Sequence, residues 1–133
     1  MKVTGRCHCG QISFAAEVDP SRARVCHCSD CQKLSGSAFR ANVGPVGASF
    51  RLTSGTPKVY ALTADSGTRR EHAFCPDCGT PIYSATQGDP LSYSLRIGTL
   101  DQRAELIPAR QIWLRSALPW TRGLDCGERI EHQ

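Results

Sequence analysis

The chain has 133 residues, of which 21% are charged, and a formal net charge of +4. This length is typical of one domain with a modest core, so we expect residues 1–133 to form a single domain. No apolar run approaches the roughly 18 residues of a membrane span, and the first residues lack the apolar stretch of a signal peptide. The sequence therefore predicts a cytoplasmic protein with no membrane partner.

Short runs of alternating or β-prone residues predict a mainly β fold. Gln11–Val18 alternates as a half-buried strand does. Turn-forming residues separate further runs of this kind, which cover residues 48–53, 58–62, 70–74, 81–85 and 91–97. The best helical segment is Ser29–Leu34, in which Ser29 or Asp30 can cap the start and Gly36 the end.

Seven of the eight cysteines fall into three groups at metal-ligand spacing: a first group of Cys7 and Cys9, a middle group of Cys26, Cys28 and Cys31, and a last group of Cys75 and Cys78. Alternate residues of a strand share a face, so each Cys-x-Cys pair can present two sulfurs to one metal. The last group, followed by Gly79, has the form of a zinc knuckle. In a reducing compartment such spacing favours zinc over disulfides. Cys126 stands apart, and we expect a free thiol there.

Seven sulfurs cannot fill two four-sulfur sites, but they can fill one closed site and leave a second with three sulfurs and an open position. A closed zinc site stabilises a fold, whereas an open one does chemistry. In one scheme the first and last groups close a site, which restricts a long loop and leaves the middle group open. In the other scheme Cys28 and Cys31 join the last group, as in a zinc ribbon. We prefer the first because each site then uses whole motifs, although spacing alone permits both.

Metal binding would also remove most of the apparent basicity. A zinc ion with four thiolates carries −2 and one with three carries −1, so a protein holding two zinc ions has a net charge of about +1. The Lys and Arg residues are scattered along the sequence. We therefore expect no nucleic-acid partner.

An open site with three thiolates favours sulfur chemistry. Three thiolates weaken the Lewis acidity of zinc toward water, but a thiolate-rich site suits a thiol substrate. A thiol bound there would lose its proton near pH 7 and add to a neighbouring aldehyde, and the reverse step is carbon–sulfur lyase chemistry. The alternative from a different class is a non-catalytic, zinc-stabilised binding module.

Several polar residues near the cysteines are secondary candidates. Strand alternation predicts that His8 and His27, each between two cysteines, point away from the metal. His72 is expected at the surface or in packing. Asp30 and Gln32 flank the last cysteine of the middle group, where they can hydrogen-bond a sulfur or the substrate, or else cap the helix and face solvent.

Arg40 follows the middle group by nine residues, and it can pair with a carboxylate of a glutathione-like thiol. We favour instead a solvent-facing strand position for Arg40, in which the buried face of the strand consists of Phe39, Ala41 and Val43. Trp113 and Trp120 can line a pocket, or they can pack in the core or in a dimer. Both a monomer and a homodimer remain open.

Together these motifs resemble the glutathione-dependent formaldehyde-activating enzyme (GFA) family. The resemblance lies in CHCG at 7–10, CHCSDCQK at 26–33, GSAF at 36–39, FCPDCGTP at 74–81, IW at 112–113 and PW at 119–120. It implies a β-tent fold, shared with methionine-R-sulfoxide reductases and a Rab chaperone, and the first cysteine scheme. The structural zinc would then be held by Cys7, Cys9, Cys75 and Cys78, and the catalytic zinc by Cys26, Cys28 and Cys31. The implied activity is that of a carbon–sulfur lyase, with a small thiol such as glutathione and a small aldehyde, formaldehyde, combining into S-hydroxymethylglutathione.

Overall fold

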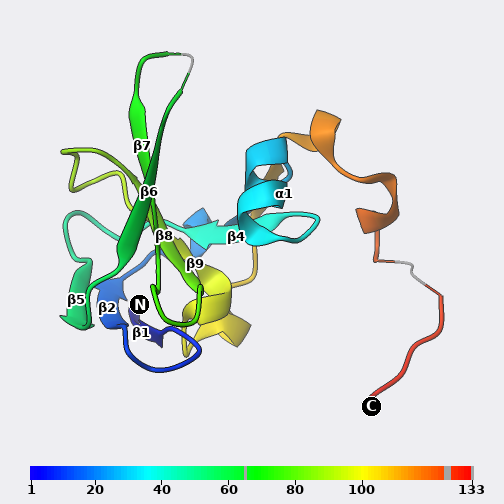
Figure 1. Cartoon of the computed structure of the whole chain (residues 1–133). Helices are drawn as coiled ribbons and strands as arrows, with labels where there is room; N and C mark the ends of the chain where they lie inside the picture. The colour runs from blue at the N-terminus through cyan, green and yellow to red at the C-terminus, as the bar shows by residue number, and fades with distance from the viewer. Residues whose placement is uncertain (65, 125–126, 133) are drawn as a thin grey trace.

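Two β-sheets and a single α-helix make up the part of the chain that the computed structural model describes, residues 1–64, 66–124 and 127–132 (Figure 1). The smaller sheet is antiparallel, in the order β1 (Lys2–Arg6), β2 (Ser13–Glu17), β5 (Arg51–Ser54). The larger sheet has the order β10 (Arg110–Ile112), β3 (Arg24–Cys26), β4 (Arg40–Val43), β9 (Ser94–Arg96), β8 (Pro81–Thr86), β7 (Arg69–Phe74), β6 (Lys58–Thr63). The mainly β prediction is confirmed.

Pairing in the larger sheet is antiparallel except between β10 and β3, which run parallel. The sequence predicted strands at the places of β2 and of β5 to β9, but it missed β1, β3 and β10. The strands β3 and β10 have three residues each, too few to show alternation. The strand β3 is paired on both edges, by β4 and by β10, and β10 is paired along one edge by β3.

The helix α1 (Ser29–Ser35) follows β3 and lies beside β4 (Figure 1). Its N-cap is Cys28, whose sulfur accepts a hydrogen bond from the amide of Cys31, and not Ser29 or Asp30 as the sequence suggested. Its end is as expected: Gly36 adopts a φ of 63°, a left-handed conformation that glycine tolerates, and its amide donates to the last turn. The described residues also form five short 3-10 helices, at Pro20–Arg22, Ile97–Thr99, Arg103–Glu105, Leu114–Ser116 and Pro119–Thr121.

An aromatic cluster joins the two sheets. Phe14 of β2 lies 5.8 Å, between ring centroids, from Phe50, and Phe50 lies 5.1 Å from Tyr83 of β8 and 4.6 Å from Tyr93. Phe14 is fully buried, and removing such a side chain from water contributes about 1.5–3 kcal/mol. These contacts pack β2 of the smaller sheet against β8 of the larger one.

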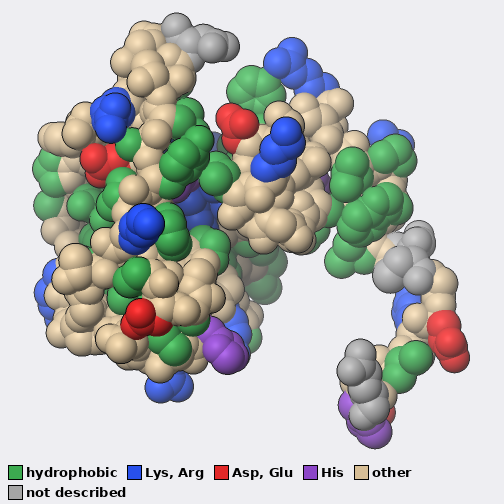
Figure 2. All heavy atoms as spheres, viewed as in Figure 1, with side chains coloured by type: hydrophobic (Ala, Val, Ile, Leu, Met, Phe, Trp, Pro, Cys, Tyr) green, Lys and Arg blue, Asp and Glu red, His purple; other side chains and the backbone are tan. Residues whose placement is uncertain are grey.

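The β6–β7 hairpin projects from the body of the molecule, and α1 stands across from it (Figure 1). Figure 2 shows a hollow between them, with basic and histidine side chains recessed inside it. Within the described ranges, no helix has the length and apolar character needed to cross a lipid bilayer.

Candidate metal centres and the adjoining cleft

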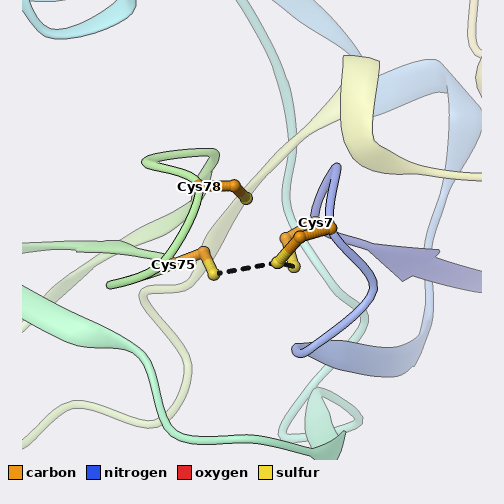
Figure 3. A group of neighbouring side chains, drawn as sticks. Cys7, Cys75 and Cys78 are labelled. Atoms are coloured by element: carbon orange, nitrogen blue, oxygen red, sulfur yellow. Dashed lines mark hydrogen bonds between the residues drawn. The ribbon is translucent and has the colours of Figure 1, made fainter.

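The first and last cysteine groups meet in one cluster, which we call the four-cysteine site: Cys7, Cys9, Cys75 and Cys78. All four Sγ atoms lie within 4.8 Å of one another, and the Cys7–Cys9 and Cys9–Cys75 sulfurs are 3.5 Å and 3.7 Å apart. A zinc ion at 2.3 Å from four tetrahedral sulfurs requires sulfur–sulfur distances of about 3.8 Å. Figure 3 shows Cys7 facing Cys75 and Cys78 across the gap between two loops. This donor set fits a closed zinc site.

Local turns hold these sulfurs in place. Cys7 directly follows β1, and its sulfur accepts a hydrogen bond from the amide of Ile12 at 3.3 Å. Cys75 begins the turn between β7 and β8, where the amide of Gly79 donates to the Cys75 carbonyl at 2.9 Å. Gly79 has a φ of 74°, as expected for a knuckle. Because β1 belongs to the smaller sheet and the knuckle to the larger one, a metal here would tie the two sheets together.

The thiols of the four-cysteine site differ in pKa. The hydroxyl of Thr80, 3.1 Å from the Cys78 sulfur, and nearby backbone amides lower the pKa of Cys78 to about 5. The amide of Gln11 favours ionisation of Cys9, but burial and the three neighbouring thiols outweigh it and raise the pKa of Cys9 to about 12. Adjacent thiols cannot all ionise without a cation, so metal binding would displace the proton of Cys9.

The middle group forms the three-cysteine site: Cys26, Cys28 and Cys31. Their sulfurs also lie within 4.8 Å of one another. Cys26 is the last residue of β3, Cys28 caps α1, and Cys31 lies in the first turn of α1. The strand end and the helix start therefore bring the three sulfurs together within six residues of chain. This grouping in space is that of the first scheme and not of the zinc ribbon, in which Cys28 and Cys31 would lie against the last group.

Exposure differs within the three-cysteine site. Cys26 and Cys31 are buried, whereas Cys28 is half-buried. Burial opposes ionisation of the Cys28 thiol, but the amide of Cys31, the two neighbouring thiols and the charge of Arg40 together lower its pKa. Burial raises the pKa of Cys31. The three sulfurs thus offer one exposed side on which a small molecule can approach a bound metal.

That exposed side opens on a cleft of about 510 Å³. Its lining includes Cys28, Asp30, Arg40, Arg70, His72 and Trp113. A second hollow of about 330 Å³ shares Arg40 and His72 with it and reaches Arg96. This is the recess seen between the β6–β7 hairpin and α1 in Figure 2. We refer to the two hollows together as the arginine cleft.

One expectation for the residues near this site is corrected by the structure. Arg40 lies on a strand as expected, but it does not face solvent: it is half-buried, and its Nε atom is enclosed. The buried positions of β4 are Asn42 and Val43, because the short strand does not keep a strict alternation. His72, which was expected on a strand at the surface or in packing, lies on β7 and is half-buried in the wall of the cleft.

His27 and Gln32 have roles in holding the site. The ring of His27 is buried against Phe39, and its Nε2 atom lies 2.7 Å from the Gln111 side-chain oxygen, so it is directed at the β10 side. The side-chain amide of Gln32 donates from Nε2 to the backbone carbonyls of His27 at 2.8 Å and Ser116 at 3.0 Å. Gln32 therefore ties α1 to the C-terminal segment and does not reach a sulfur.

The tryptophans lie apart. Trp113 lines the cleft with Cys28, is half exposed, and has a φ of 59°, an uncommon conformation for a bulky residue that tends to mark functional sites. Trp120 borders a shallow hollow with Gln32 and Gly36 on the far end of α1. His8 is exposed beside the four-cysteine site. Cys126 lies outside the described residues.

Sequence reasoning missed the cationic residues of the cleft other than Arg40, namely Arg70 and Arg96, and the side chain of Asn42 that holds one of them. A signal was present for Arg96, since it stands between Leu95 and Ile97 in a run otherwise typical of a buried strand. A charged residue in such a run needs a partner or a function.

Comparison with known proteins agrees with this picture. The family model described as glutathione-dependent formaldehyde-activating enzyme matches residues 2–116, which cover both cysteine sites and the cleft. The chain therefore belongs to the GFA family. A crystal structure of a Rhodobacter sphaeroides protein is 21% identical in sequence and matches with a TM-score of 0.62 over 81% of this chain and 98% of that one. At this identity the likeness shows a shared fold.

Proposed function

We propose that the chain is a zinc-dependent enzyme that makes or breaks a carbon–sulfur bond between a small thiol and a small aldehyde. Family membership supports glutathione and formaldehyde as the pair, which react to S-hydroxymethylglutathione. The observation that carries the proposal is the exposed side of the three-cysteine site, where half-buried Cys28 opens on a cleft of about 510 Å³. A purely structural centre would have no need of this opening.

In this proposal Cys26, Cys28 and Cys31 hold one zinc ion and the four-cysteine site a second. When bound in the open site, zinc would lower the pKa of a substrate thiol and hold its sulfur at the cleft. The substrate sulfur then forms a bond to the aldehyde carbon, the π electrons of the carbonyl move to its oxygen, and that oxygen takes the proton the thiol gave up. Arg40, opposite Cys26, offsets the negative charge of the sulfurs.

The thiols require a reducing environment, so a cytoplasmic location accompanies the proposal. Thiolates oxidised to disulfides could not bind metal, and the sulfurs of each site are close enough for oxidation to compete with metal binding.

The test is exchange NMR of formaldehyde with a panel of thiols that includes glutathione and cysteine. We expect the zinc-loaded protein to accelerate adduct formation with at least one thiol above the spontaneous rate. Cys28→Ser should abolish the acceleration, while Ser29→Ala, at the exposed neighbouring position, should retain it. If no thiol is accelerated by the unmodified protein, and cobalt at the three-cysteine site shows no spectral change with thiol, the protein is a binding module and the enzyme proposal fails.

A further inference from the structure

Three arginines and a histidine surround the floor of the arginine cleft. Arg40 comes from β4, Arg70 and His72 from β7, and Arg96 from β9. Within the described residues, the side chains of Arg70 and Arg96 donate hydrogen bonds to neutral oxygens and not to carboxylates. Asp30 is an acidic residue of the cleft lining and is exposed.

Arg96 is the most deeply placed of the four, with 6% of its surface exposed. Its hydrogen bonds within the described residues all come from Nη1, which donates to the Asn42 side-chain oxygen at 2.6 Å, to Ser84 at 3.4 Å and to the Ser94 carbonyl at 3.3 Å. Its Nε atom is buried with no partner. A buried donor on a charged group costs free energy when it stays unpaired, and the Nε atom itself is too enclosed to meet a ligand. The Arg96 side chain nevertheless lines the second hollow, where an acceptor from outside the protein can approach its charge.

The guanidinium is held in a fixed orientation. Asn42, which accepts from Arg96, also donates to the Arg40 carbonyl at 3.3 Å, and Ser84 accepts from both Arg96 and Arg70 at 3.4 Å. Arg40, like Arg96, has a buried Nε atom with no partner. The guanidinium of Arg96, held by these bonds, and the side chain of Arg40 line the same hollow.

The electrostatics point in the same direction. Burial and the charges of Arg40 and Arg70 lower the pKa of Arg96 to about 9, against an opposing effect of Cys31, and the group stays charged at neutral pH. Burial and the same arginines lower the pKa of His72 to about 4, so His72 is neutral there. A three-thiolate zinc site of charge −1 balances only one of the three cations. An anion in the cleft would relieve the repulsion among them.

We propose that Arg96 and Arg40 form a carboxylate-binding site beside the three-cysteine site, and that the substrate of this protein carries a carboxylate group in addition to the group that reacts at the cysteines. The carboxylate would pair with the guanidinium groups where they line the cleft, because hydrogen bonds between arginine and an ionised carboxylate are stronger than those between neutral groups. The carboxylate site stands on the cleft residues alone, whereas its assignment to the substrate rests on the proposed function.

A matched pair of thiols tests the substrate assignment. Isothermal titration of the zinc-loaded protein should show about tenfold tighter binding of 3-mercaptopropionate than of 3-mercaptopropionamide, which has the same shape without the charge. Arg40→Gln and Arg96→Lys should bring the ratio close to one. Arg51→Gln, an exposed arginine of the smaller sheet, should leave the ratio unchanged. If the variant at the buried Arg96 folds poorly, the ratio measured with Arg40→Gln still tests the proposal.

A second arm needs no thiol. Propionate, titrated at constant ionic strength, should raise the melting temperature of the unmodified protein and of Arg51→Gln, but not that of Arg40→Gln, because an anion that binds only the folded state stabilises it.

The two arms separate the proposals. If both thiols bind equally and propionate stabilises Arg40→Gln as much as the unmodified protein, the carboxylate site is overturned while the proposed function stands. If neither thiol binds but propionate stabilises the protein through Arg40, the carboxylate site stands and the thiol chemistry fails.

Discussion

Cys26 and Arg40 lie directly opposite each other in the antiparallel pair of β3 and β4. This register places a cation against a cysteine at the strand end where the three-cysteine site begins. Two residues further along β4, Asn42 faces Arg96 of β9 and accepts its hydrogen bond. One short strand thus links the sulfur cluster to the buried arginine, and a shift of its register would separate them.

Loss of a four-cysteine ligand should damage the fold. Cys75→Ala should unfold or aggregate the protein, because Cys75 is fully buried and a metal held there would join the two sheets. Circular dichroism and size-exclusion chromatography provide the measurement.

Loss of a three-cysteine ligand should spare the fold. Cys28→Ala should keep a cooperative melting transition but bind one zinc ion fewer, because this site is built from one local segment. Metal analysis gives the count. A collapsed Cys28→Ala protein with a stable Cys7→Ala protein would contradict these roles.

The two metal sites should also differ in lability. We expect purified protein to hold up to two zinc ions and a chelator to remove the ion at the three-cysteine site first, since it has one protein ligand fewer and an exposed side at Cys28. The release can be followed with a colorimetric zinc indicator. The assignment of the two sites would be contradicted if both zinc ions left at the same rate. It would also be contradicted if the protein unfolded before the three-cysteine site lost its zinc ion.

Gly5 should tolerate no side chain. A Cβ atom there would overlap the ring of Phe14, its cross-strand neighbour, and come 2.8 Å from the Thr99 carbonyl oxygen. Gly5→Ala should therefore lower the free energy of unfolding by about 1–3 kcal/mol, as overpacking of a core does. Urea unfolding measures the loss. Gly98→Ala is the control, because a Cβ atom at that position meets no atom within 4 Å.

His72 should make the folded protein sensitive to mild acid. Burial and the charges of Arg40, Arg96 and Arg70 lower its pKa to about 4, with Asp30 opposing them weakly, whereas an unfolded histidine titrates near 6.5. The unfolded chain therefore binds the proton more readily between these values, and stability falls as pH drops through that window.

His72→Gln should lose this part of the pH dependence. The difference in unfolding free energy between the unmodified protein and His72→Gln, measured from pH 7.5 to 4.5, isolates the histidine from the cysteines, which titrate in both proteins. An equal slope for the two proteins would show that His72 ionises as freely in the folded state as in the unfolded one.

The sequence by itself determined the elements that depend on neighbouring residues. The alternation of Gln11–Val18 predicts β2, and Gly36 ends α1 because a left-handed residue closes the helix. The spacing of the cysteine groups predicted metal binding, and the structure brings the sulfurs together in sets of four and three. These features are local, or they rest on residue types with few alternative uses.

Only the tertiary structure decided what lies around the sulfurs. Arg40, Arg70 and Arg96 come from three strands, and no spacing in the sequence shows that β4, β7 and β9 bring these side chains to the two adjoining hollows of the arginine cleft. The choice between the two cysteine schemes likewise depended on which turn packs against the end of β1. Such choices follow from the order of strands in a sheet, which is fixed by the sum of many long-range contacts.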